Sequence, residues 1–155
     1  YYFPAATVKD MMQFYRGFYP HFDMERYEKF KEVFSIDEKR TIRRLSKGMQ
    51  KQVAFWLALS TTPDFLLLDE PTTYLDIKNQ LSLMRRLRLL AEEGRGILTV
   101  MHDITLALNF SDKIAVLNNG KIVFYGTPQE VLKSGIIKTV FGVEINDDYS
   151  LKIEK

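Results

Sequence analysis

A serine, a lysine and a glycine stand together at the start of one apolar stretch, where they are suited to phosphate chemistry. Ser46 is a good helix N-cap, Lys47 adds positive charge and Gly48 lets the backbone approach a ligand closely. Because the N-terminus of a helix presents free backbone N–H groups, this combination can bind phosphate. The alternative is an ordinary N-cap without a ligand.

Two carboxylates follow the apolar run Leu66-Leu67-Leu68 without a gap. At the end of a buried strand, Asp69 is well placed to hold Mg²⁺, directly or through water. The next carboxylate, Glu70, can polarise the attacking water in phosphoryl transfer. A strand that ends in a solvated acidic turn is the alternative, and the direct step from apolar residues to Asp-Glu-Pro argues against it.

A histidine closes the second apolar run, Val100-Met101-His102-Asp103. At the end of a strand, His102 is able to contact the γ-phosphate of a nucleotide. A purely structural histidine is the alternative, and it is the commoner case for a lone histidine.

The elements that must position these segments follow from hydrophobic periodicity and turn signals. Helices are predicted over residues 8–19, 23–34, 49–59, 77–93 and 104–110, with Thr7 as an N-cap. Strands are predicted over 65–69 and 96–101, and a hairpin joins 113–117 to 121–125 through Asn118-Asn119-Gly120. The short apolar runs are typical of strands covered on both faces, and their alternation with helices predicts a parallel sheet.

Composition is that of a globular domain: 155 residues, 46% hydrophobic and 27% charged. A net charge of +2 is too small to indicate nucleic acid or an anionic membrane as a partner, and the absence of cysteine excludes disulfides and thiolate metal sites. No run approaches the roughly 18 apolar residues of a membrane span, and Tyr1-Tyr2-Phe3-Pro4 does not resemble a signal peptide. A cytosolic protein is therefore expected.

Taken together, the segments resemble the ABC ATPase family. Leu45–Gln50 resembles the signature motif, Phe65–Glu70 resembles Walker B, Thr73–Asp76 resembles the D-loop, and His102 resembles the switch histidine. They occur in the family's order, with 23 residues from Ser46 to Asp69 and 33 from Asp69 to His102. Gly126–Leu132 resembles the family's usual ending.

The sequence departs from the family's pattern at two places. The signature usually reads Leu-Ser-Gly-Gly-Gln, whereas Lys47 and Met49 differ here. Thr73 and Tyr74 stand where the D-loop often has small residues. We expect the first departure to be tolerated, because Lys47 adds positive charge near the phosphate.

The resemblance implies an α/β fold in two parts. Residues 1–61 would form a helical subdomain with the signature motif. Residues 62–155 would form the C-terminal part of the catalytic core, a partial P-loop-NTPase (RecA-like) and mostly parallel sheet with a C-terminal β-hairpin and helices.

The resemblance also implies a role for each site residue. Glu70 would be the general base, Asp69 would hold Mg²⁺, and His102 would sense the γ-phosphate. The implied ATP-binding residues, which would act across a dimer interface, are Ser46, Lys47, Gly48, Met49, Gln50 and Asp76. The implied partners are a second nucleotide-binding domain, in a head-to-tail or strand-exchanged homodimer, and a membrane-spanning transporter subunit on the inner face of the cell membrane.

The P-loop that the family needs is not found in the sequence. The glycines stand at positions 17, 48, 94, 96, 120, 126, 135 and 142, and none opens a Gly-x-x-x-x-Gly-Lys-Ser/Thr pattern. We therefore expect this chain alone not to bind or hydrolyse ATP usefully, and to need a P-loop supplied from elsewhere. The alternative to an ATPase part is a non-hydrolytic folding or interaction module.

Two further features leave alternatives open. Up to Glu70 the sequence resembles exporter-type ABC-2 proteins, and from Thr72 on it resembles metal-chelate importers. An engineered junction near Pro71 and ordinary family diversity both explain this. The aromatic residues between Phe14 and Phe22 are interpreted as core of the helical part, with a groove for a transporter's coupling helix as the alternative.

Overall fold

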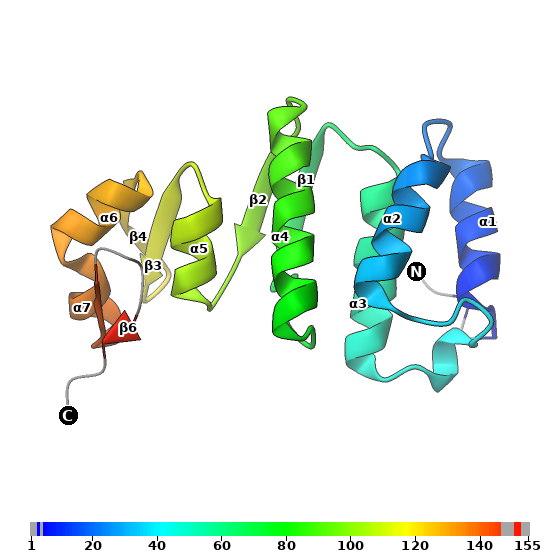
Figure 1. The fold of residues 1–155 in the computed structure, drawn as a ribbon, viewed down its shortest axis with the longest axis horizontal. Helices are drawn as coiled ribbons and strands as arrows, with labels where there is room; N and C mark the ends of the chain where they lie inside the picture. The colour runs from blue at the N-terminus through cyan, green and yellow to red at the C-terminus, as the bar shows by residue number, and fades with distance from the viewer. Residues whose placement is uncertain (1–2, 4, 147–150, 153–155) are drawn as a thin grey trace. The chain divides into compact units, whose positions relative to one another are not determined.

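The computed structural model describes residues 3, 5–146 and 151–152. The chain divides into two compact units, Tyr1–Val100 and Met101–Lys155, and the elements of each are labelled in Figure 1. Each unit is described by itself below. No helix among the described residues is long and apolar enough to cross a membrane.

The described residues of the first unit form four α-helices, one short 3₁₀ helix and two strands. Along the chain they are α1 (Val8–Phe18), α2 (Met24–Phe34), η1 (Ile42–Arg44), α3 (Lys47–Ser60), β1 (Phe65–Asp69), α4 (Ile77–Glu92) and β2 (Gly96–Val100). The predicted elements are confirmed, with small differences at their ends. Thr7 caps α1 in a capping box with Asp10, as expected from its position.

The core of the first unit lies where α3 packs against α1 and α2. Trp56 of α3 is fully buried and stacks on Tyr27 of α2, with ring centroids 4.6 Å apart. The indole N–H of Trp56 donates to the carbonyl oxygen of Tyr27 at 2.7 Å. The burial expected for the apolar helix α3 is therefore confirmed.

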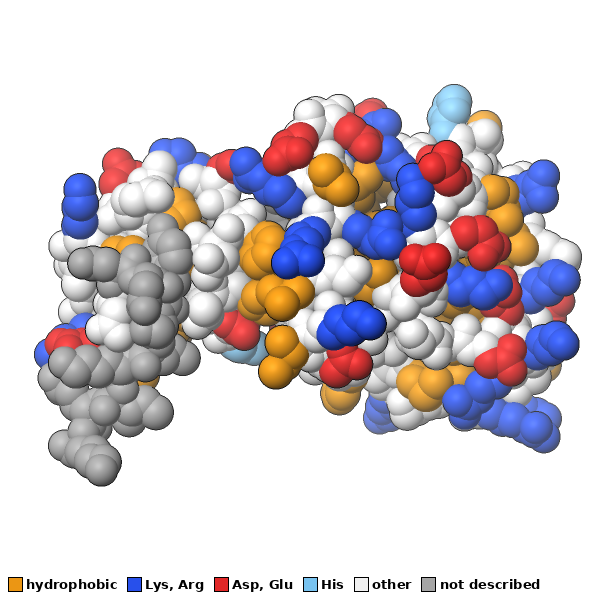
Figure 2. All heavy atoms as spheres, viewed as in Figure 1, with side chains coloured by type: hydrophobic (Ala, Val, Ile, Leu, Met, Phe, Trp, Pro, Cys, Tyr) orange, Lys and Arg blue, Asp and Glu red, His pale blue; other side chains and the backbone are white. Residues whose placement is uncertain are grey.

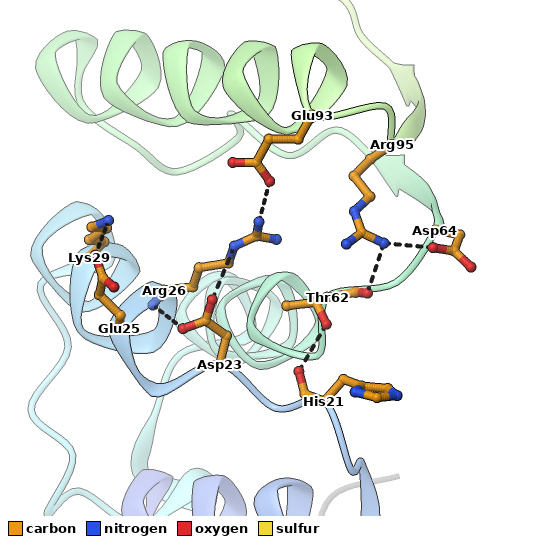
Figure 3. Close-up of polar contacts among 9 residues, drawn as sticks. All are labelled: His21, Asp23, Glu25, Arg26, Lys29, Thr62, Asp64, Glu93 and Arg95. Atoms are coloured by element: carbon orange, nitrogen blue, oxygen red, sulfur yellow. Dashed lines mark hydrogen bonds and ion pairs between the residues drawn. The ribbon is translucent and has the colours of Figure 1, made fainter.

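Polar contacts hold the end of α4 and the residues that precede β1 and β2 (Figure 3). Arg26 of α2 forms an ion pair with Glu93 at the end of α4. Arg95 donates to the side chain of Asp64 at 2.6 Å and to the carbonyl oxygen of Thr62 at 3.4 Å. Because Thr62 and Asp64 precede β1 and Arg95 precedes β2, these contacts set where both strands begin.

The two strands form the parallel pair that the sequence predicts. The register runs from Phe65 opposite Gly96 to Asp69 opposite Val100. Both strands therefore end at the same edge, which is where the acidic segment follows.

The expectation that these strands are covered on both faces is wrong. In β1, Leu66 and Leu68 are buried, whereas Phe65 and Leu67 are 60% and 65% exposed. Side chains alternate across a strand, so one face of β1 is buried while the other stays exposed. In this unit α4 packs against the neighbouring strand β2. We call the uncovered apolar side chains the open sheet face; they are Phe65, Leu67, Leu98 and Val100.

Several aromatic side chains for which the sequence favours a place in the core are also exposed. Phe14 and Phe18 stack on each other at a centroid distance of 6.0 Å on the surface of α1, and Tyr19 is exposed beside Phe18. The core interpretation is wrong for these three, because the residues that α1 buries are Val8, Met11 and Met12.

The second unit contains the predicted helices and hairpin. Its elements are α5 (Ile104–Phe110), β3 (Ile114–Asn118), β4 (Lys121–Gly126), α6 (Pro128–Ser134), α7 (Ile136–Phe141), β5 (Glu144–Ile145) and β6 (Leu151–Lys152). The β3–β4 hairpin turns at Asn119 and Gly120, both with positive φ, as the Asn-Gly signal predicts. Leu108, Val116, Val131 and Ile137 form its buried core.

Candidate functional site

The two carboxylates lie where β1 and β2 end together. Asp69 is the last residue of β1, and the backbone N–H of Glu70 donates to the carbonyl oxygen of Val100 at 2.9 Å. Glu70 has φ +48, a left-handed conformation that is uncommon outside glycine and is often found at functional sites. Its side-chain Oε2 accepts a hydrogen bond from the Thr73 hydroxyl at 3.1 Å, so the carboxylate is oriented by its own turn.

The signature-like segment forms the start of α3. The Ser46 hydroxyl accepts a hydrogen bond from the backbone N–H of Met49 at 3.2 Å. Ser46 is therefore the N-cap of α3, as predicted. Ser46 and Lys47 are exposed, whereas Gly48 is buried. The side-chain amide of Gln50 donates to the carbonyl oxygens of η1 and its C-cap, and so holds η1 to α3.

The structure brings the start of α3 and the acidic turn together. The Lys51 ammonium lies 3.9 Å from a carboxylate oxygen of Asp69. The ring of Tyr74, in the D-loop-like segment, lies against Gly48, and the side-chain amide of Gln52 donates to the carbonyl oxygen of Tyr74 at 3.0 Å.

Sequence reasoning did not assign a site role to Lys51 or Gln52. A signal for Gln52 was present: it stands one turn after Gly48 and therefore on the same face of the helix. For Lys51 the sequence shows only that it follows other basic residues, which are Lys39, Arg40, Arg43, Arg44 and Lys47.

Asp76 is engaged at the start of α4. Its carboxylate accepts from the backbone N–H of Asn79 at 2.8 Å, and it is the N-cap of that helix. The residue is exposed, so its carboxylate both caps α4 and faces solvent.

His102 lies in the second unit, two residues beyond the end of β2. It is exposed, and the next residue, Asp103, caps α5 by accepting from the backbone N–H of Leu106 at 2.9 Å. The contacts described above therefore join residues of the first unit only.

Positive charge surrounds the start of α3. Figure 2 shows Lys and Arg side chains gathered over η1 and the beginning of α3. The exposed members are Lys39, Arg40, Arg43, Arg44 and Lys47. Such a cluster raises the local positive potential and favours an anionic ligand.

The acidic turn fits a magnesium ion that is shared with a substrate. The Asp69 side chain is 75% exposed at the strand end. No group of three or more His, Cys, Asp or Glu side chains that could hold a metal is found among the described residues. Magnesium usually binds one or two carboxylates together with phosphates and waters, so a single accessible aspartate is compatible with it.

Comparison with known proteins gives the family. A family model described as "AAA domain, putative AbiEii toxin, Type IV TA system" matches residues 7–109. The petrobactin import ATP-binding protein FpuC of Bacillus anthracis is 36% identical over 152 residues, which cover 90% of this chain and 55% of that protein. The chain spans about half the length of the curated relatives it matches.

Solved structures share the fold. The structure of an ATP binding subunit of an ABC transporter matches with a TM-score of 0.70 and 23% identity, over 92% of this chain and 59% of that one. A dimeric post-hydrolysis structure of the ATP-binding cassette MJ0796, bound to ADP and Pi, matches with a TM-score of 0.58 and 29% identity, over 67% of this chain and 46% of that one. The predicted α/β fold class is thus confirmed. The chain belongs to the ABC family of nucleotide-binding domains, and the AAA-type family model covers most of its length.

Proposed function

We propose that this chain supplies the catalytic carboxylates and the signature segment of an ABC transporter ATPase, while the P-loop that grips ATP is provided by residues other than these 155. The observation that carries the proposal is the meeting of the acidic turn with the start of α3, through Lys51 and Asp69 at 3.9 Å and through Tyr74 against Gly48.

In this proposal Glu70 acts as the general base. Its carboxylate is oriented by the Thr73 hydroxyl at 3.1 Å, and its backbone is tied to the end of β2 at 2.9 Å. A carboxylate held in this way can orient a water for in-line attack and accept its proton. Asp69 would hold Mg²⁺, which, when bound, neutralises charge on the phosphate oxygens.

The signature-like segment would serve an ATP bound by a second nucleotide-binding domain. Ser46 and Lys47 are exposed at a helix N-terminus within a basic cluster, which suits a phosphate group. Gly48, Met49 and Gln50 complete the segment. The dimeric form of the MJ0796 cassette supports an assembly of two such domains.

Two residues near the start of other helices have separate proposed roles. Asp76 would act across the dimer interface, and His102 would sense the γ-phosphate. Both are exposed, and each stands at or next to a helix N-cap that fixes its backbone.

We also propose that the complete protein works as a peripheral subunit on the cytoplasmic face of a membrane, bound to a membrane-spanning transporter subunit. FpuC is a petrobactin import ATP-binding protein, and its match covers 90% of this chain. This match to one importer-type protein runs across Pro71 and over most of the chain. It therefore favours ordinary family diversity over an engineered junction near Pro71. In functional terms, residues 1–61 would carry the signature segment and residues 62–155 the catalytic carboxylates.

The second candidate is a non-hydrolytic module that only folds or associates with a partner. The open sheet face and the absence of a P-loop pattern in this sequence favour it. The two candidates differ in whether Glu70 matters once a P-loop is present.

Phosphate release in a reconstituted mixture separates the two candidates. The chain is mixed with a P-loop-bearing N-terminal half of a related ATP-binding domain and with Mg-ATP. We expect release above that of either part alone, and a loss of about 100-fold or more in Glu70→Gln with ATP binding retained.

The matched control is Glu25→Gln, a carboxylate that is 77% exposed on α2 and forms a surface ion pair with Lys29. It should leave phosphate release unchanged. A mixture that binds ATP but releases no phosphate, or that releases it equally with Glu70→Gln, supports the non-hydrolytic module instead.

A further inference from the structure

The ring of Tyr74 takes up the space beside Gly48 that a larger side chain would need, although the two residues are far apart in the chain. A Cβ atom placed on Gly48 would lie 2.7 Å from Cγ and 2.8 Å from Cδ2 of the Tyr74 ring. Real Cβ atoms do not approach other atoms so closely, so glycine is required at position 48 as long as the ring stays where it is. Gly48 is thus buried by a side chain of the D-loop-like turn.

Tyr74 is not held in place by burial. The residue is 71% exposed, and its backbone has φ +69, a strained conformation for a bulky residue. The side-chain amide of Gln52, which is only 6% exposed, donates to the carbonyl oxygen of Tyr74 at 3.0 Å. Because Gly48 and Gln52 are one turn apart on α3, the same face of that helix contacts both the ring and the backbone of Tyr74.

The residue before Tyr74 contacts the proposed base. The Thr73 hydroxyl donates to the Glu70 carboxylate at 3.1 Å, and the Thr73 backbone N–H donates to the carbonyl oxygen of Glu70 at 3.3 Å. A displacement of Glu70 would therefore move Thr73 and, because it is the next residue, Tyr74. The ring of Tyr74 has no room to move toward α3, because Gly48 already lies against it.

We propose that Tyr74 is a positioning residue that couples the Glu70 turn to the first turn of α3 within one chain. The role of this coupling rests on the proposed function. In each protomer, the catalytic carboxylate and the signature segment that the same protomer presents to its partner would shift together. The contact itself is independent of that function and can be tested without ATP.

A double-mutant cycle in thermal unfolding of the full chain tests the contact. We expect Gly48→Ala to lower Tm by several degrees when Tyr74 is present, because the new methyl group meets the ring. In a Tyr74→Ala background the same change should leave Tm unchanged or raise it, since alanine is a better helix residue than glycine. Tyr74→Phe keeps the ring and should behave like the parent.

Gly17 provides the matched control. It also lies in a helix, but a Cβ placed there meets nothing within 4 Å. Gly17→Ala should therefore not lower Tm in either background. If Gly48→Ala has the same Tm as Gly17→Ala while Tyr74 is present, the inferred contact between Tyr74 and Gly48 is wrong.

An NMR experiment tests the coupling apart from the packing. Thr73→Val removes the hydrogen bond to Glu70, and we expect it to shift the Gly48 amide and α-proton resonances in the parent and in Tyr74→Phe, but not in Tyr74→Ala. If the Tyr74 ring only filled space, the loss of the Thr73 hydrogen bond would not reach the Gly48 resonances through it. Absence of the shift in the parent, or an equal shift without the ring, overturns the proposal.

Because neither experiment uses ATP, failure of phosphate release would count against the proposed function alone.

Discussion

Glu38 shows how a single carboxylate ties a loop to a helix in the first unit. It accepts a hydrogen bond from the Tyr27 hydroxyl at 2.8 Å and forms an ion pair with Lys31. Burial raises the pKa of the Glu38 carboxyl, but the hydrogen bonds from Lys31 and Tyr27 outweigh it and hold that pKa below its usual value. The ionised form is therefore favoured by the folded state.

Glu38→Gln should lower the free energy of unfolding in a pH-dependent way. A depressed pKa stabilises the fold above the unfolded value, near pH 4.5, and this contribution is lost as the pH falls through the folded pKa. The difference from the parent, measured by urea unfolding, should be largest at neutral pH and shrink below about pH 4. A difference that stays constant from pH 7 to pH 3 would contradict the assignment.

Asp76 carries two roles that different substitutions separate. Asp76→Ala removes the N-cap of α4 and should lower stability by about 1 kcal/mol. Asp76→Asn keeps a capping oxygen, so urea unfolding should show little change. If the charge also acts across a dimer interface, Asp76→Asn should still slow phosphate release in the reconstituted mixture. Normal release by Asp76→Asn would limit the residue to its capping role.

At the scale of elements, α3 is the helix that connects the core to the site. One side of it buries Trp56 against Tyr27, and its first two turns carry Gly48 and Gln52 against the acidic turn. The same packing that stabilises the helical part therefore sets the direction of the signature-like segment.

Substitution of Trp56 should test this dependence. Trp56→Ala leaves a large cavity and should lower the free energy of unfolding by about 3–5 kcal/mol. Trp56→Phe keeps an aromatic ring but leaves the Tyr27 carbonyl without its 2.7 Å hydrogen bond, so we expect a smaller loss of about 1–3 kcal/mol. Urea unfolding measures both, and an equal loss in the two variants would assign the stability to the hydrogen bond.

At the scale of the whole molecule, the open sheet face is the surface that most needs a partner. Four apolar side chains of β1 and β2 face solvent, and within the described part of the chain these two strands pair only with each other. Exposed apolar faces and open strand edges promote association. A P-loop-bearing segment that adds to the sheet would cover them.

Leu67 and Leu68 give a paired test of that surface. Leu67→Lys changes a side chain that is 65% exposed and should leave stability within about 0.5 kcal/mol of the parent. It should also weaken association with the P-loop-bearing half, as measured by analytical ultracentrifugation. Leu68→Lys places a charge at a position only 2% exposed and should unfold the unit. Unchanged association in Leu67→Lys would exclude this face as the contact.

The sequence by itself determined the elements and the order of the candidate site. The caps at Thr7 and Ser46, the parallel strand pair and the Asn119-Gly120 turn all depend on local rules of backbone geometry and hydrogen bonding. These rules act over a few residues, so a single sequence reveals them.

Tertiary structure alone decided which apolar residues are covered and which site residues meet. An apolar strand such as β1 has the same sequence pattern whether one face or both faces are packed. The exposure of Leu67 therefore could not be predicted from the sequence. The contact of Tyr74 with Gly48 joins segments far apart in the chain, and no local rule predicts it. Burial and long-range contact depend on what the rest of the chain places alongside a residue, and that information is spread over the whole fold.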